Sequence, residues 1–166
     1  MNDREGMELI TKKVEKCVAM AYTGNTPRRD WNFGRNGSEL YTSDFLSRWP
    51  VDIYISTAGK DVLTGHELLP QTPDNNPVKE IYRLYNGALE NGRSSWDQIA
   101  VLFAVQPHLF EIDSIGSLWQ NADYETYWDV ENNNPKHKRI NPIISNRELE
   151  IIIEKMMAEL PLNMKP

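Results

Sequence analysis

Two short, largely apolar segments constrain the fold of this chain more than any other feature. Residues 17–22 read CVAMAY and residues 51–56 read VDIYIS. A strand with one buried face alternates apolar and polar side chains, whereas a strand covered on both faces is apolar along most of its length. These segments therefore predict two neighbouring strands of a mostly parallel sheet that is flanked by helices.

The rest of the hydrophobic pattern alternates between helical and extended periods. It predicts helices at residues 4–13, 41–49, 77–89, 94–105 and 146–160, the last stopped by Pro161, and further strands at 109–113 and 124–130. This alternation is typical of an α/β layer structure. With 166 residues and 40% hydrophobic content, the chain can bury one substantial core, so we expect residues 1–166 to form a single domain.

Charge and hydropathy exclude several classes of partner. There are 24 acidic and 18 basic residues, and the net charge of −6 disfavours binding to nucleic acid. The one basic cluster, residues 136–139, is interpreted as a short solvated turn. No apolar run approaches the ~20 residues of a membrane span, and residues 1–13 lack a signal-peptide core. We expect no membrane contact and a cytoplasmic location by default; a secreted or periplasmic form with a removed leader would carry the same mature sequence.

The reactive side chains form none of the common catalytic motifs. The sequence contains no G-x-G-x-x-G, G-x-x-x-x-G-K-[ST], H-E-x-x-H or G-x-S-x-G. Cys17 lies in a predicted strand, which favours a buried structural role. The histidines, His66, His108 and His137, are scattered singly and are expected in loops or on the surface. The chemical candidates that remain are the polar loop after the first strand and Asp97.

Asp97 allows two interpretations. It lies in the first turn of a predicted helix, where Ser94 can cap, Ser95 and Gln98 fit a capping box, and an acid gains roughly 0.3–1 kcal/mol from the helix dipole. The following residues, 98–105, are apolar almost all round and predict a buried helix. A buried carboxylate needs a cation, because an isolated one costs several kcal/mol. The second interpretation is therefore a metal ligand.

Four segments together resemble the C-terminal half of the nucleoside hydrolase family, the inosine-uridine-preferring N-ribohydrolases. They are TGNTPRRDWNF (23–33), VDIYISTAGKDVLTG (51–65), RSSWDQIAVLFAV (93–105) and the terminal MMAELP (156–161). The resemblance runs over nearly the whole chain. It implies a Rossmann-like fold, a bound Ca²⁺ ion and hydrolysis of the N-glycosidic bond of ribonucleosides.

The resemblance also assigns individual residues. Asn25 is similar to the family residue that contacts the ribose 5′-hydroxyl, Asp30 stands where the family usually has Glu, and Asn32 matches a second ribose-holding amide. Asp97 corresponds to a calcium-ligating aspartate. Trp96 stands in the place of a histidine that assists the leaving base.

Two departures from the family pattern limit the expected activity. The chain lacks the N-terminal D-x-D-x-x-x-D-D cluster that supplies the general base and most calcium ligands, and RNGSE (35–39) replaces D-P-E-A-A. The catalytic base is therefore not in this chain, and we expect the isolated chain to be inactive, so its status as an enzyme stays open.

Three interpretations compete. The chain is a hydrolase portion completed by an N-terminal half, an inactive nucleoside-binding, sugar-binding or interaction module of the same fold, or an unrelated α/β domain. In the first two the small-molecule partner is a nucleoside or a ribose-like compound. Half of such a sheet would leave an edge and an apolar face uncovered, so we also expect a homo-oligomer or pairing with a complementary N-terminal half.

Overall fold

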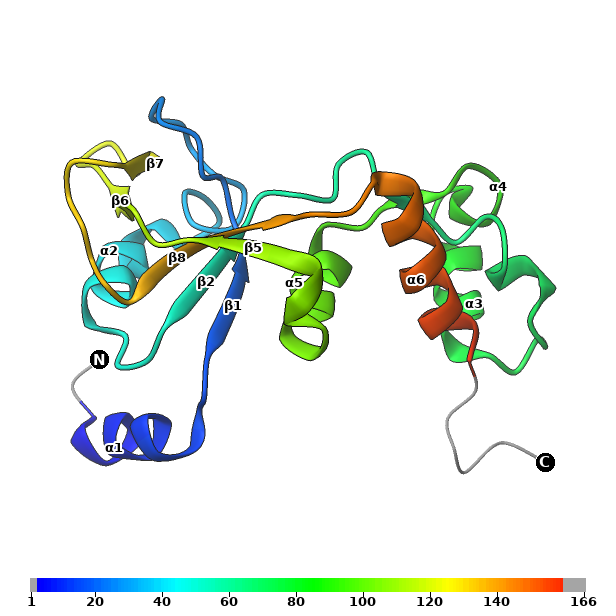
Figure 1. Cartoon of the computed structure of the whole chain (residues 1–166), viewed down its shortest axis with the longest axis horizontal. Coiled ribbons are helices and arrows are strands. Elements are labelled where there is room, and N and C mark those ends of the chain that lie inside the picture. The colour runs from blue at the N-terminus through cyan, green and yellow to red at the C-terminus, as the bar shows by residue number, and fades with distance from the viewer. Residues whose placement is uncertain (1–2, 160–166) are drawn as a thin grey trace. The chain divides into compact units, whose positions relative to one another are not determined.

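A computed structural model describes residues 3–159 and divides the chain into two compact units (Figure 1). The first unit holds residues 3–57 and 103–141, and the second holds residues 58–102 and 142–159. The expectation of a single domain stays a prediction, as does the stop at Pro161, which lies outside the described residues.

The first unit is built on a four-stranded sheet of order β1-β2-β8-β5. Its strands are β1 (Cys17–Met20), β2 (Ile53–Ser56), β5 (Phe110–Asp113) and β8 (His137–Pro142), the last residue of β8 falling in the second unit. Strands β1 and β2 are parallel, with Cys17 opposite Ile53, and β2 and β8 are also parallel. The predicted adjacency of the two apolar segments and the mostly parallel α/β sheet are confirmed.

The remaining elements of the first unit are two helices, one hairpin and a 3-10 turn. These are α1 (Arg4–Lys13), α2 (Glu39–Arg48), η2 (Pro107–Leu109) and the antiparallel pair β6 (Ser117–Gln120) and β7 (Thr126–Asp129). Buried side chains from β2, α2 and the hairpin form one core, which includes Ile55, Leu46 and Trp128. Helix α1 and strands β5 and β7 were predicted; β6 was not.

The second unit is mainly helical. Its elements are β3 (Leu63–Thr64), η1 (Leu69–Gln71), α3 (Pro77–Leu84), α4 (Ala88–Asn91), β4 (Arg93–Ser94) and α6 (Asn146–Ala158), and helix α5 (Trp96–Val105) crosses the boundary between the units. The single helix predicted for residues 77–89 is in fact α3 followed by α4. Gly87, with a φ of 76°, separates them in a left-handed conformation that glycine adopts readily.

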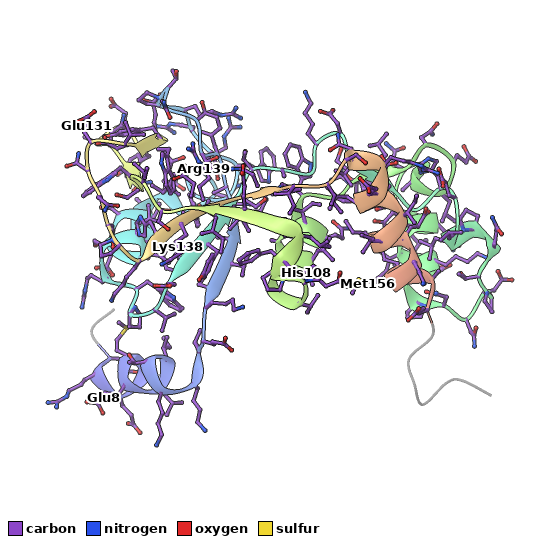
Figure 2. All side chains as sticks on the ribbon, in the orientation of Figure 1. Glu8, His108, Glu131, Lys138, Arg139 and Met156 are labelled. Atoms are coloured by element: carbon purple, nitrogen blue, oxygen red, sulfur yellow. The ribbon has the colours of Figure 1, made fainter. Side chains whose placement is uncertain are left out.

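The basic cluster at residues 136–139 differs in part from the solvated turn that the sequence predicts. Lys136 lies in an exposed turn as predicted, whereas Lys138 and Arg139 lie on β8, a central strand of the sheet (Figure 2). The Lys138 ammonium pairs with Asp52 at 2.7 Å and lies over the Tyr54 ring, and the Arg139 guanidinium pairs with Asp113 at 2.6 Å. Because each charge has a partner beside the sheet, a charged sequence can occupy a central strand.

The expectation of loop or surface histidines is also wrong for His137. This residue is 2% exposed on β8, and its Nε2 lies 2.9 Å from the carbonyl oxygen of Leu46. Burial lowers the pKa of His137, and the positive charge of Lys138 lowers it further, while the Leu46 carbonyl acts in the opposite direction. Cys17 lies on β1 as predicted, but it is half-buried and not fully buried. Partial burial still raises the pKa of its thiol.

The His137 environment predicts a pH dependence of stability. Between the lowered pKa of the folded state and about 6.5, the unfolded chain binds more protons than the folded one, so stability falls as pH drops through this window and levels off below it. An NMR titration of the His137 ring measures the effect directly. We expect a midpoint below that of histidine in a short unstructured peptide; a midpoint at or above about 6.5 would contradict the buried neutral ring.

Candidate functional site

The polar loop that follows β1 is organised by one buried carboxylate. Asp30 is 5% exposed and accepts three backbone hydrogen bonds: from the N–H of Tyr22 at 2.9 Å, of Asn32 at 2.7 Å and of Phe33 at 2.9 Å. Buried carboxylates are stable when several donors replace their lost hydration. Asp30 therefore ties the loop back onto the end of its own strand.

Asn32 reinforces the same connection from its amide. The Asn32 Nδ2 donates to the carbonyl oxygen of Met20 at 2.9 Å, at the last residue of β1. Its Oδ1 accepts no hydrogen bond within residues 3–159, and the exposed side chain of Asn25 forms none in that range either. Two amide groups of the loop therefore keep hydrogen-bonding capacity that a ligand could use.

The β6–β7 hairpin supports the loop from its other side. Arg28 and Thr126 exchange two backbone hydrogen bonds, at 3.2 and 2.8 Å, and the N–H of Trp128 donates to the carbonyl of Gly24 at 2.9 Å. Gly34 packs tightly between the two segments, because a Cβ there would lie 2.8 Å from the backbone nitrogen of Asp30 in the loop and 2.9 Å from the carbonyl oxygen of Tyr124 in the hairpin. Any larger residue at position 34 would force the loop and hairpin apart.

Arg139 adds a charged contact that the sequence analysis missed. Its Nη2 donates to Asp113 and its Nη1 to the carbonyl of Thr23 at the start of the loop, at 3.4 Å. The pKa of Asp113 is lowered, first by the hydrogen bond from the backbone N–H of Ile115 and then by Arg139. Figure 2 shows Arg139 on β8, where its basic neighbours had suggested a turn.

Asp97 lies in the second unit, in the first turn of α5, and its carboxylate is exposed. The prediction that it is buried at the start of a fully buried helix is wrong. Ile99, Leu102 and Phe103 are buried, whereas Val101, one turn after Asp97, is 62% exposed. Helix α5 therefore buries one side, and Asp97 is on the other.

The serines before Asp97 contact neighbouring elements. Ser94 Oγ donates to the carbonyl of Lys60, and Ser95 Oγ lies 2.7 Å from Thr64 Oγ1 within a buried hydroxyl cluster that includes Tyr82. Gln98, the other half of the predicted capping box, donates through Nε2 to the Tyr82 hydroxyl at 3.0 Å. These bonds fix the start of α5, and Trp96 beside it is half-buried.

A cavity of about 340 Å³ adjoins Asp97 in the second unit. Apolar side chains of α3, α5 and α6 line most of it, and Asp97 and Gln98 are its polar members. Asp97 forms no ion pair with any residue in the described part of the chain. Its carboxylate is therefore available to a cation from outside residues 3–159.

The predicted site residues fall into two groups. Asn25, Asp30 and Asn32 share the loop of the first unit, and Asp30 and Asn32 are bonded to each other through the Asn32 N–H. Trp96 and Asp97 share the start of α5 in the second unit. Within residues 3–159, no group of three or more His, Cys, Asp or Glu side chains could hold a metal ion.

Comparison with known proteins provides no assignment: no family model and no curated protein matches the chain. None of the described helices is both long enough and apolar enough to span a membrane.

Asp30 is predicted to be essential for the loop. Replacement by Ala leaves three backbone N–H groups without their acceptor, so Asp30→Ala should lower the free energy of unfolding by about 2–4 kcal/mol. The measurement is urea unfolding followed by circular dichroism. Asp123→Ala, at an exposed carboxylate of the same unit, is the matched control and should change stability by less than about 0.5 kcal/mol. Equal effects of the two substitutions would contradict the proposed role of Asp30.

Proposed function

We propose that this chain is the sugar-binding portion of a nucleoside N-ribohydrolase. One observation carries the proposal: a polar loop ordered by hydrogen bonds follows β1 at the carboxyl end of a parallel strand pair, and in it the Asn25 amide and the Asn32 Oδ1 have no partner among residues 3–159. Ligands of open α/β sheets bind in the loops at that edge. The resemblance of TGNTPRRDWNF to the family's ribose-holding segment supports the same location.

The chemistry of the reaction explains what these amides would contribute. Cleavage of an N-glycosidic bond passes through an oxocarbenium-like state, so the sugar must be held while water attacks the anomeric carbon. Asn25 and Asn32 would hold ribose hydroxyls. The resemblance places Asp30 among the ribose-binding residues, but its carboxylate already accepts three backbone hydrogen bonds. Asp30 would therefore position Asn32, and the amides would make the direct contacts with ribose.

The described residues alone do not fit a calcium site. Calcium takes 6–8 oxygen ligands, several of them carboxylates, and Asp97 supplies one. Its exposure and lack of an ion pair are compatible with a metal ligand whose other partners come from a complementary N-terminal half. On this proposal the general base and the remaining ligands also belong to that half.

A second candidate is a module of the same fold that binds a nucleoside or sugar without cleaving it. Such a module would need the ribose loop but no calcium site. The two candidates share the ribose loop and differ in whether a partner half restores turnover.

Complementation distinguishes them. Alone, the chain should bind calcium no more tightly than about millimolar, because affinity at such sites follows the number of charged ligands, and it should release no ribose from inosine or uridine. With an N-terminal nucleoside hydrolase half that carries the aspartate cluster, both calcium binding and ribose release should appear. Calorimetry with calcium and a reducing-sugar assay are the measurements.

Two substitutions in the complemented protein should fail in different ways. Asp97→Asn should weaken calcium binding, whereas Asn32→Ala should leave it unchanged and mainly reduce turnover through poorer ribose positioning. Asp61→Asn, at another exposed carboxylate of the second unit, is the control for the change of charge. Ribose release or micromolar calcium affinity in the chain alone would show that the site is elsewhere.

A further inference from the structure

Three guanidinium groups in and around the loop after β1 lie over aromatic rings. The pairs, with the distance from the arginine Cζ to the ring centroid, are Arg28–Tyr22 at 4.5 Å, Arg29–Tyr124 at 5.9 Å and Arg35–Trp31 at 5.6 Å. These six residues are called the arginine–aromatic surface below. The loop that carries five of them is fixed by Asp30, and Tyr124 belongs to the hairpin segment that contacts Gly34.

The positive charge of this surface has no carboxylate partner in the part of the chain that the structure describes. Within residues 3–159, Arg28, Arg29 and Arg35 form no ion pair with a carboxylate. Asp30 is the nearest acid along the chain to Arg28 and Arg29, but it is buried and its oxygens accept backbone hydrogen bonds; Glu39, the nearest to Arg35, accepts a hydrogen bond from the Gly37 N–H. In a chain whose net charge is −6, three exposed arginines without a carboxylate partner therefore concentrate positive charge on one loop, where an anion would be attracted.

Trp31 gives the surface a second property. Its side chain is 67% exposed although it is the largest apolar group of a loop that is otherwise held firmly in place. Arg35 lies over one face of this ring, and the part that stays exposed offers a flat stacking surface on a loop that hydrogen bonds already order, so a planar ligand gains contact area without ordering the loop. Stacking on aromatic and guanidinium planes is a common way for proteins to bind nucleobases.

We propose that the arginine–aromatic surface binds a nucleoside phosphate, with the base stacked on Trp31 and the phosphate held by Arg28 and Arg35. This inference rests on the proposed nucleoside site and extends it, since the free amides of Asn25 and Asn32 are in the same loop as the arginines. A guanidinium fork matches phosphate oxygens with two parallel hydrogen bonds. A long polyanion is a poorer fit, because only three cations are available and the rest of the chain is acidic.

Calorimetric titration of the 166-residue chain with adenosine 5′-monophosphate, adenosine, ribose 5-phosphate and inorganic phosphate tests the proposal. The monophosphate should bind at least about tenfold more tightly than adenosine, and the difference should shrink as salt is raised. It should also bind more tightly than inorganic phosphate or ribose 5-phosphate, because these lack the base.

Variants locate the two halves of the ligand. In the double variant Arg28→Gln and Arg35→Gln, the monophosphate should lose its advantage over adenosine. Trp31→Leu should weaken both ligands, by roughly tenfold or more for loss of one stacked base. Arg4→Gln, at an exposed arginine of α1, and Trp119→Leu, at a partly exposed tryptophan of β6, are the matched controls and should leave binding unchanged. Circular dichroism and urea unfolding verify that each variant is folded.

The possible failures separate this inference from the proposed function. If adenosine binds and the monophosphate binds no more tightly than adenosine, the phosphate inference is overturned and the nucleoside site stands. If the double arginine variant still binds the monophosphate more tightly than adenosine, the phosphate is held elsewhere and the inference is again overturned. If no ligand that contains a base binds, both the inference and the nucleoside site in the isolated chain are overturned.

Discussion

The buried carboxylate of Asp30 is the interaction on which the loop after β1 depends. A single charged side chain replaces three missing backbone partners, for Tyr22, Asn32 and Phe33, in a segment that belongs to neither a helix nor a strand. Irregular backbone at a sheet edge otherwise leaves polar groups that are costly to bury. The hairpin contacts and the tight approach at Gly34 require the loop geometry that Asp30 imposes.

This constraint has a consequence for ligand binding. A loop that is already ordered loses little conformational entropy when a ligand arrives, so its free amides and arginines can contribute more of their interaction energy to affinity. Asp30 is buried and its carboxylate already accepts three backbone hydrogen bonds, which disfavours a direct chemical role. In the proposed function the carboxylate would shape the site, while Asn25, Asn32 and the neighbouring arginines would contact the ligand.

Some of this arrangement could be predicted from sequence and some could not. Strands β1 and β2 were recognised because they are apolar on both faces, and α1 because its apolar residues repeat at helical spacing. Strand β8 was missed because Lys138 and Arg139 look like surface residues; their partners, Asp52 and Asp113, are 86 and 26 residues away, and only the folded chain brings them together. Hairpin strand β6 was missed as well, although β7 was found.

For Asp30 and Asp97, too, the sequence indicates only the local part of each residue's role. The spacing of Asp30 and Asn32 is typical of a turn in which an aspartate bonds the backbone two residues on, and that local signal could have indicated its structural role. No local sequence pattern predicts the hydrogen bond from the Tyr22 N–H to the Asp30 carboxylate, which joins residues eight positions apart. For Asp97, the nearly uniform apolar composition of α5 hides which side of the helix is covered, so the sequence could not predict that Asp97 and Val101 are exposed.

Amide hydrogen exchange measured by NMR is the most direct test of the central claim that Asp30 locks the loop. The N–H groups of Tyr22, Asn32 and Phe33 should exchange slowly in the wild-type chain, because each donates to the buried carboxylate, and all three should lose protection together in Asp30→Ala. The exposed loop amides of Thr26 and Arg29 should exchange quickly in both proteins. If the three amides exchange as fast as these exposed ones in the wild-type chain, the loop is not held by Asp30 and the account of a preformed site is wrong.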